Sequence, residues 1–491
     1  MPAAGIRTHH QVTFAALAAG VAAYALLQSL VTPVLTTVQA QLHTTQSAAT
    51  WVLTAYLLSA SVFTPIMGRI GDMAGKKRVF VVALVALAAG SLLAALASNI
   101  GLMIFARAVQ GIGGGVLPLA FGIIRDEFPR EKVAGAVGLL ASLTAVGAGL
   151  GIVLAGPIVN ALDYHWLFWI PGIVIAGSAA ATHYLVPESP VRAGGKVSWV
   201  AAILLSGWLV ALLLAVSEAP SWGWLSTSVI GLIVAAFVIA GAWVMVELRS
   251  RNPLIDMRMM RARAVWTTNL VGFMFGAGMY AVFAFVPEFV QTPTSAGYGF
   301  GASITESGLI SLPMAIVMFI FGSLSGPLSA RIGARMVLFA GSVVSAVGFL
   351  MWALTHSEIW QVSVAMSLLG AGIGLGFSAM TSIIVDAVPS SQTGVASGMN
   401  ANIRTIGGAV GAAVVASVVT ANVRSDGFPQ ESGYTNGYLV LAAASVVGAA
   451  ACLLIRNLRV DRDELQAEQA GLAHAEAGMV AAATLVGDLP E

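Results

Sequence analysis

Long apolar runs with almost no charge alternate with short polar breaks along most of this chain. The runs approach or exceed the roughly 20 residues that an α-helix needs to cross the hydrocarbon core of a bilayer. We therefore predict fourteen membrane-spanning helices, at residues 13–35, 51–67, 79–97, 102–124, 133–159, 166–186, 198–216, 225–246, 267–289, 308–326, 336–354, 362–385, 395–419 and 437–455.

The breaks between these runs group the helices as six, two and six. The expected fold class is an all-α integral membrane protein, in which a two-helix hairpin is inserted between two six-helix bundles. The predicted domains are an N-terminal bundle at residues 1–190, a linker with the two extra helices and a basic segment at 191–265, a C-terminal bundle at 266–456 and a cytoplasmic tail at 457–491.

The composition agrees with this fold class and excludes others. Hydrophobic residues make up 58% of the 491 residues and charged residues 9%, whereas soluble domains hold about 45–50% and about 25%. A net charge of +1 gives no electrostatic footprint for nucleic acid. The single cysteine, Cys452, excludes disulfide bonds within the chain. We expect a multi-pass monomer in the cell membrane.

The basic residues gather in alternate loops of the predicted topology. Twenty of the 23 Lys and Arg residues fall on one side, only Arg424 falls on the other, and Arg107 and Arg404 lie within predicted helices. Loops rich in Lys and Arg stay on the cytoplasmic side of a membrane. With an even number of spans, both termini are predicted to be cytoplasmic.

The densest basic segment has a counterpart in the second half of the chain. Residues 68–78 read GRIGDMAGKKR, and residues 326–335 read GPLSARIGAR. The aligned pairs are Gly68 with Gly326, Gly75 with Gly333, Lys77 with Arg335 and Asp72 with Ala330. Further glycine-rich motifs lie 43 residues after Gly68 and 44 residues after Gly326. Two related halves of this kind are typical of transporters that bind substrate at the midplane and open to either side in turn.

These motifs carry a resemblance to the major facilitator superfamily, and in particular to its fourteen-helix drug:proton antiporter branch. The resemblance covers residues 13–455. Five residues match the family's motif between helices 2 and 3, and three match its helix 4 motif: Gly68, Asp72, Gly75, Lys77 and Arg78, and Arg107, Gln110 and Gly111.

The family's motif between helices 2 and 3 latches the inward gate. The resemblance implies that Asp72 lies near the start of helix 13, at about Gly394, because a helix N-terminus favours an anion. The alternative interpretation is a basic turn that only sets the topology.

Helix 5 matches the family's antiporter motif in part, at Gly147, Gly149, Gly151, Gly156 and Pro157. The position where the family has its first proline holds Ala148 here. Glycines at such spacing let helices approach closely, and proline bends a helix. The stretch is predicted to be a hinge or a tight seam, which by resemblance supports export. Ordinary packing of small residues is the alternative.

The energy source is expected to be an ion gradient. The chain has no Gly-x-x-x-x-Gly-Lys-Ser/Thr motif that would cradle the phosphates of ATP. Proton coupling needs a titratable group in a cavity, but Gln28 stands in helix 1 where the family carries aspartate. The candidates are Arg107, Glu288 and Arg404. Glu288 could instead be an interfacial carboxylate, and Arg404 could simply tie helices together.

The substrate site is expected at the centre of the molecule, with mostly apolar walls. The candidate residues are Tyr24, Gln28, Tyr56, Gln110, Phe273, Met274 and Tyr280. Helix packing or lipid contact is an equally suitable interpretation for these side chains. No histidine cluster suggests a metal site, and no cofactor is predicted.

The main hypothesis is a secondary active transporter, not an enzyme. It would export lipophilic or cationic drug-like compounds in exchange for protons by alternating access. Its partners would be a small-molecule substrate, protons and membrane lipids. The alternatives are an exporter of one endogenous metabolite or lipid, or a membrane enzyme or scaffold. The chain has no catalytic set at its span ends that would support an enzyme.

Overall fold

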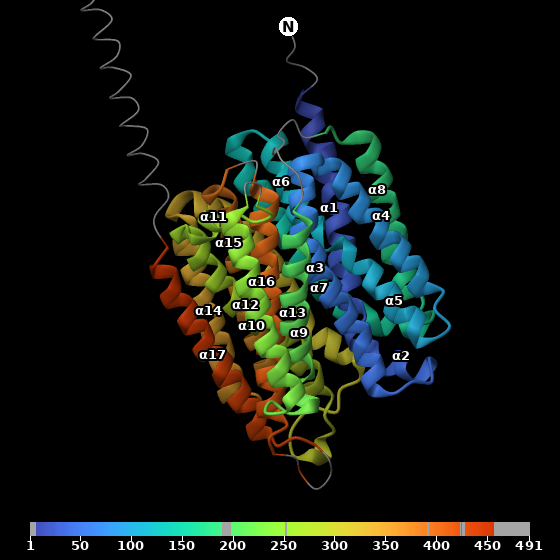
Figure 1. Ribbon diagram of the computed structural model, residues 1–491. Helices are drawn as coiled ribbons and strands as arrows, with labels where there is room; N and C mark the ends of the chain where they lie inside the picture. The colour runs from blue at the N-terminus through green and yellow to red at the C-terminus, as the bar shows by residue number, and fades with distance from the viewer. Residues whose placement is uncertain are drawn as a thin grey trace, which may run out of the picture.

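A computed structural model describes residues 6–188, 198–250, 253–389, 392–422, 424 and 428–455, and every regular element in these ranges is a helix. Fourteen of the described helical segments are long and apolar enough to cross a membrane. They stand side by side as one bundle (Figure 1). The predicted number of spans and the all-α fold class are therefore confirmed. The tail predicted at 457–491 lies outside the described residues.

The first six spans pack as one group. They are α1 (Ile6–Leu30), α3 (Gln46–Ala74), α4 (Lys76–Ala95), the segment formed by α5 (Ile100–Gly111), η2 (Ile112–Gly115) and α6 (Val116–Glu127), α7 (Arg130–Ala161) and α8 (Trp166–Leu185). Two short helices, η1 (Thr32–Val34) and α2 (Leu35–Gln41), follow α1. Within this group α1 packs on α7 and α8, α3 packs on α5, and α4 packs on α8.

The last six spans repeat this packing. They are α12 (Arg263–Gln291), α13 (Ile304–Ile332), α14 (Ala334–Leu354), α15 (Ile359–Ala387), α16 (Thr393–Val419) and α17 (Glu431–Leu453). Here α12 packs on α16 and α17, α13 packs on α15, and α14 packs on α17. Each of these pairs is the counterpart of a pair in the first group, so the internal repeat in the sequence is also a repeat of packing.

The two halves meet along two seams. One seam joins α7 to α13, and the other joins α3 to α16. The extra hairpin, α9 (Trp199–Trp222) and α10 (Thr227–Arg249), leads through α11 (Met257–Arg261) into α12. Because α9 contacts both α3 and α16, the hairpin covers the second seam.

The fourth span differs from its prediction as a continuous helix. A 3-10 turn, η2, interrupts it at Ile112–Gly115. The three glycines of this turn are buried, and a Cβ on Gly114 would lie 2.9 Å from the Ala60 carbonyl oxygen of α3. The turn therefore brings the fourth span into backbone contact with α3.

The segment at 68–78 is also more helical than the predicted turn. Helix α3 continues to Ala74 and α4 begins at Lys76, so Gly75 alone reverses the chain, with φ at 113°. Its repeat partner Gly333 does the same between α13 and α14, with φ at 89°. Only glycine adopts such positive φ values without strain, which explains why both halves have glycine at this point. We call the end of the bundle that carries Lys76, Lys77 and Arg78 the basic end.

We expect Gly333→Ala to destabilise the protein by about 1–3 kcal/mol, the usual cost of forcing a side chain into such a backbone conformation. The apparent melting temperature of the detergent-purified protein measures the effect. Gly241→Ala is the matched control, because Gly241 lies within α10 and a Cβ there would meet no atom within 4 Å. Equal melting temperatures for the two variants would contradict the strain argument.

Candidate functional site

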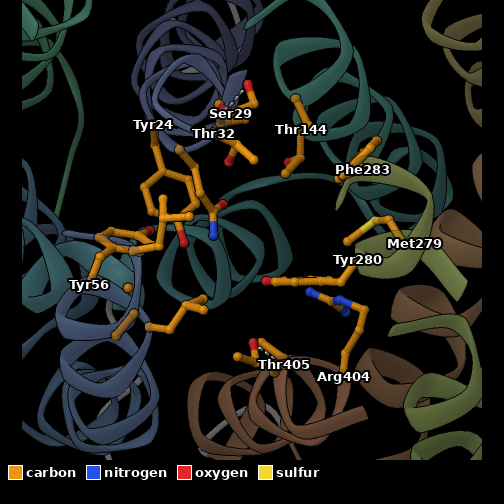
Figure 2. Close-up of a pocket in the computed structure, with 18 of the residues that line it drawn as sticks. Tyr24, Ser29, Thr32, Tyr56, Thr144, Met279, Tyr280, Phe283, Arg404 and Thr405 are labelled. Carbon is orange, nitrogen blue, oxygen red and sulfur yellow. Dashed lines mark hydrogen bonds between the residues drawn. The ribbon is translucent and has the colours of Figure 1, made fainter. Parts of the chain in front are cut away.

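A central cavity of about 250 Å³ lies between the two halves. Side chains from both halves line it and leave a shared space between them (Figure 2). Its polar lining residues are Tyr24, Gln28, Ser29, Thr32, Tyr56, Thr64, Arg107, Thr144, Tyr280, Arg404 and Thr405. The remaining lining is apolar or glycine and includes Met279, Phe283, Met318 and Phe377. An apolar cavity with a few polar groups is the usual form of a site for small organic molecules.

The structure brings six of the predicted site residues to this cavity: Tyr24, Gln28, Tyr56, Arg107, Tyr280 and Arg404. Figure 2 shows Tyr24 and Tyr56 on one side, from α1 and α3, and Tyr280 and Arg404 on the other, from α12 and α16. A molecule in the cavity would touch both halves, so its contacts would change when the halves move relative to each other.

Arg107 is fixed by neutral groups. Its side chain is 1% exposed, and its guanidinium donates to the Val52 carbonyl at 3.1 Å and to the Gln110 amide oxygen at 2.7 Å. The guanidinium also lies over the Tyr56 ring, 4.4 Å from its centre. Gln110 in turn donates to the Ser91 hydroxyl at 3.1 Å. Gln110 therefore positions Arg107 and does not line the cavity itself.

Arg404 has a similar setting in the other half. It is 9% exposed and lies over the Phe377 ring, 4.0 Å from its centre. It makes one long hydrogen bond, 3.5 Å, to the Asn400 amide oxygen. The Asn400 amide nitrogen donates to Asn269 at 2.9 Å, which turns the Asn400 oxygen toward the arginine.

Three other predicted residues lie away from the cavity wall. Phe273 is on the same face of α12 as Tyr280 but two turns closer to the basic end, where its backbone packs on Gly407 of α16. Met274 is one residue further around the helix and faces a small space beside α14 and α17. The hydrophobic pattern could not separate these positions from Tyr280, because all three occur in one apolar run.

Glu288, the third of these residues, is exposed at the end of α12 opposite the basic end. Its carboxylate accepts a hydrogen bond of 2.9 Å from the Tyr434 hydroxyl of α17. The carboxylate therefore faces a neighbour within its own half.

Asp72 lies where the resemblance implied. Its carboxylate is fully buried at the basic end and accepts hydrogen bonds from the backbone nitrogens of Gly394, at 3.3 Å, and Val395, at 3.1 Å. These nitrogens belong to the first turn of α16, where the helix dipole favours an anion. The close approach requires glycine, because a Cβ on Gly68 would lie 2.6 Å from the Gly394 carbonyl oxygen. The contact joins the two halves.

The lysine that is buried beside Asp72 is Lys76. The match to the family motif named Lys77 instead. The Lys76 ammonium is 2.5 Å from an Asp126 carboxylate oxygen and 3.7 Å from Asp72, with no exposed side-chain surface. Arg78 instead points outward, with 70% of its side chain exposed, and pairs with Glu188 at 3.3 Å. Each residue along α4 turns the side chain by about 100°, so Lys77 is partly exposed although Lys76 is buried.

Two further residues tie the halves together, Arg125 at the basic end and Asn402 closer to the middle of the bundle, and the sequence analysis missed both. The Arg125 guanidinium donates to the Thr393 hydroxyl at 2.6 Å and to the Val388 carbonyl at 2.8 Å. The Asn402 amide donates to the Ser61 carbonyl at 2.7 Å. The sequence signal that could have identified them is a polar residue at the end of an apolar run, as for Arg125, or inside one, as for Asn402. Asp72 and Arg125 therefore hold the two halves together at the basic end, and Asn402 joins α16 to the middle of α3.

The motif glycines of the fifth span lie in α7 and form a seam with neighbouring helices on two sides. A Cβ on Gly147 would meet the Ala22 carbonyl at 2.8 Å, and Gly151 likewise abuts α1. On the other side, Gly149 abuts Ala315 and Gly156 abuts Thr305, both in α13. Pro157 lies within the same helix, and Ala148 lines the cavity. These contacts favour the tight seam over the hinge.

Comparison with known proteins gives a family match across the chain. The family model described as Major Facilitator Superfamily matches residues 17–412 and 268–486. The multidrug transporter protein MdtP of Bacillus subtilis is 30% identical over 382 residues, which cover 76% of this chain and 69% of that protein. The uridine/deoxyuridine transporter of Lactococcus lactis is 28% identical over 439 residues, covering 86% of this chain and 89% of that protein.

A solved structure shows the same fold. The crystal structure of the human organic anion transporter MFSD10 superposes with a TM-score of 0.65 and covers 92% of this chain and 100% of that one. The sequence identity is 15%, so this likeness supports the architecture alone.

Proposed function

Because this chain belongs to the major facilitator superfamily, we propose that it is a secondary active exporter of lipophilic drug-like compounds, driven by proton exchange. The central cavity carries the proposal, because residues of both halves line it while the contacts of Asp72 and Arg125 close the basic end. Such an arrangement is one state of an alternating-access cycle. The MdtP relative, named as a multidrug transporter, supports the substrate class.

We place the basic end in the cytoplasm, from the distribution of Lys and Arg. The closed gate then faces inward, and the described conformation is one from which a compound would leave toward the outside. The uridine transporter among the relatives is a reason to include uridine among the compounds tested, as the alternative of one endogenous metabolite.

The proton site remains part of the proposal. Among the described residues, the cavity wall holds no carboxylate, so Gln28 is not replaced there by a neighbouring acid. Glu288 is exposed at the outer end on this orientation and is held by Tyr434. It could exchange protons with the outside solution. Arg107 and Arg404 would respond to that charge through the movement of the helices that carry them.

Transport in sealed vesicles under an imposed pH gradient tests this function. The wild-type protein is expected to move lipophilic dyes against their gradient only while the pH gradient lasts. We expect Glu288→Gln to lower gradient-driven transport at least about tenfold, the range for losing one charge-assisted interaction, and to leave dye binding unchanged.

Glu218→Gln is the control, because Glu218 is a carboxylate at the end of α9 whose hydrogen bond within the described residues comes from nearby Ser221. Full gradient-driven transport by Glu288→Gln would remove that residue from the proposal. If the rate of dye movement is the same with and without the pH gradient, proton exchange itself is rejected.

A further inference from the structure

The described wall of the central cavity carries positive charge and no carboxylate. Two guanidinium groups, Arg107 and Arg404, belong to its wall, and none of the described lining residues is aspartate or glutamate. Arginine stays protonated in proteins. Burying a charge in a membrane protein is costly unless it is paired. A bound molecule is therefore the natural source of the missing negative charge.

The protein groups around both arginines are neutral. Arg107 contacts a backbone carbonyl, an amide oxygen and a tyrosine ring. Arg404 contacts an amide oxygen and a phenylalanine ring. No ion pair to either guanidinium occurs in the described part of the chain. These contacts hold the two groups in place without neutralising them.

Arg404 also has donors to spare. A guanidinium carries five N–H groups, and the hydrogen bond that this one makes within the described residues is the long one to Asn400, at 3.5 Å. In Figure 2 the Arg404 guanidinium extends beside Tyr280 toward the shared space of the cavity. An oxyanion there could accept two parallel hydrogen bonds, the geometry that arginine favours with carboxylates. Gln28 carries no charge, so it would not neutralise the guanidinium groups.

Resting on the proposed function, we propose that the transported compounds are lipophilic organic anions, with a carboxylate or similar oxyanion held by Arg404 and attracted by the second positive charge of Arg107. The aromatic rings of Tyr24, Tyr56, Tyr280 and Phe283 would pack on the apolar part of the molecule. This narrows the drug-like class predicted from the sequence and removes lipophilic cations from it, because two like charges in the wall repel them.

Equilibrium binding to the purified full-length protein in lipid nanodiscs tests this at neutral pH. The probes share one ring system: 1-naphthylacetate, neutral 1-naphthylacetamide and 1-naphthylethylammonium. We expect the acetate to bind about tenfold tighter than the acetamide, the size of a charge-assisted hydrogen bond, and the ammonium to bind more weakly than both. Equal affinity for acetate and acetamide, tightest binding of the ammonium, or no binding of any probe would overturn the proposal.

Variants assign the effect to the cavity. Arg404→Gln and Arg107→Gln are each expected to lower acetate affinity about tenfold while acetamide affinity stays within about twofold, which also shows that the variant is folded. Arg404→Lys keeps the charge and should retain a preference for the acetate. Arg335→Gln is the control, because its guanidinium bonds the Leu453 carbonyl at the basic end, away from the cavity. An acetate preference that survives both Gln variants would overturn the assignment.

Binding needs no gradient, so the two proposals fail separately. If the acetate binds as expected but no probe crosses vesicle membranes under any gradient, the anion site stands and export is rejected. If the ammonium is exported and the acetate is not, export stands and the anion site is rejected.

Discussion

Replacing Asp72 by asparagine is expected to open the basic end of the protein and to lower transport at least about tenfold. The substitution removes a buried anion from the N-terminus of α16, where Asp72 meets the Gly394 and Val395 nitrogens. An interaction of this kind contributes up to about 2 kcal/mol, or about thirtyfold in the balance between closed and open states. It also leaves Lys76 with one carboxylate fewer.

Cysteine labelling measures the opening. Ser397 lies in α16 next to Gly398, which abuts Pro65 of α3, and Ser397 is 6% exposed, so a Ser397→Cys probe in a Cys452→Ser background should react slowly with maleimide. Adding Asp72→Asn should raise the labelling rate by up to about thirtyfold. Asp163→Asn is the control, since the Asp163 side chain is 54% exposed and its carboxylate bonds neighbouring His165. Unchanged labelling and transport in Asp72→Asn would show that Asp72 is not a latch.

The second large effect is expected from Gly149→Leu on the other seam. A Cβ at this position already falls against Ala315, 3.1 Å from its Cα atom, and the leucine branch would push α7 away from α13. Overpacking of this kind costs about 1–3 kcal/mol. Because the α7–α13 seam joins the two halves, we expect transport to fall at least about tenfold even where the protein still inserts and purifies.

Gly135→Leu provides the matched control in the same helix, because a Cβ there would meet no atom within 4 Å. It should transport like the wild type at equal amounts of protein in the vesicles. If Gly149→Leu transports as well as Gly135→Leu, the seam tolerates separation and its glycines are ordinary packing residues.

The architecture could be predicted from the sequence because its signals are local. An uncharged run of sufficient length must span the bilayer, and fourteen such runs became fourteen helices. The repeated glycines at 75 and 333 are needed by the backbone itself, which has positive φ at both. The position of Asp72 beside Gly394 was implied by the family motif, which already contains the tertiary contact.

The sequence could not decide which side of each helix faces the cavity. Phe273, Met274 and Tyr280 lie in one apolar run, yet only Tyr280 reaches the cavity. Lys76 and Lys77 are adjacent and chemically identical, yet Lys76 alone enters the buried cluster with Asp72 and Asp126. Nearly every position of a membrane helix is apolar, so hydrophobicity does not mark the inward face.

Charge balance was also outside the reach of the sequence. The chain holds 22 acidic residues against 23 basic ones. This nearly neutral total gives no sign of the net positive charge of the described cavity wall. Only the folded arrangement shows that Arg107 and Arg404 share one cavity wall while Glu288 lies outside it. The sequence determined that this protein is a two-part membrane bundle, because spanning and repetition are read along the chain. The tertiary structure decided the character of its site, because that depends on which distant side chains face the same space.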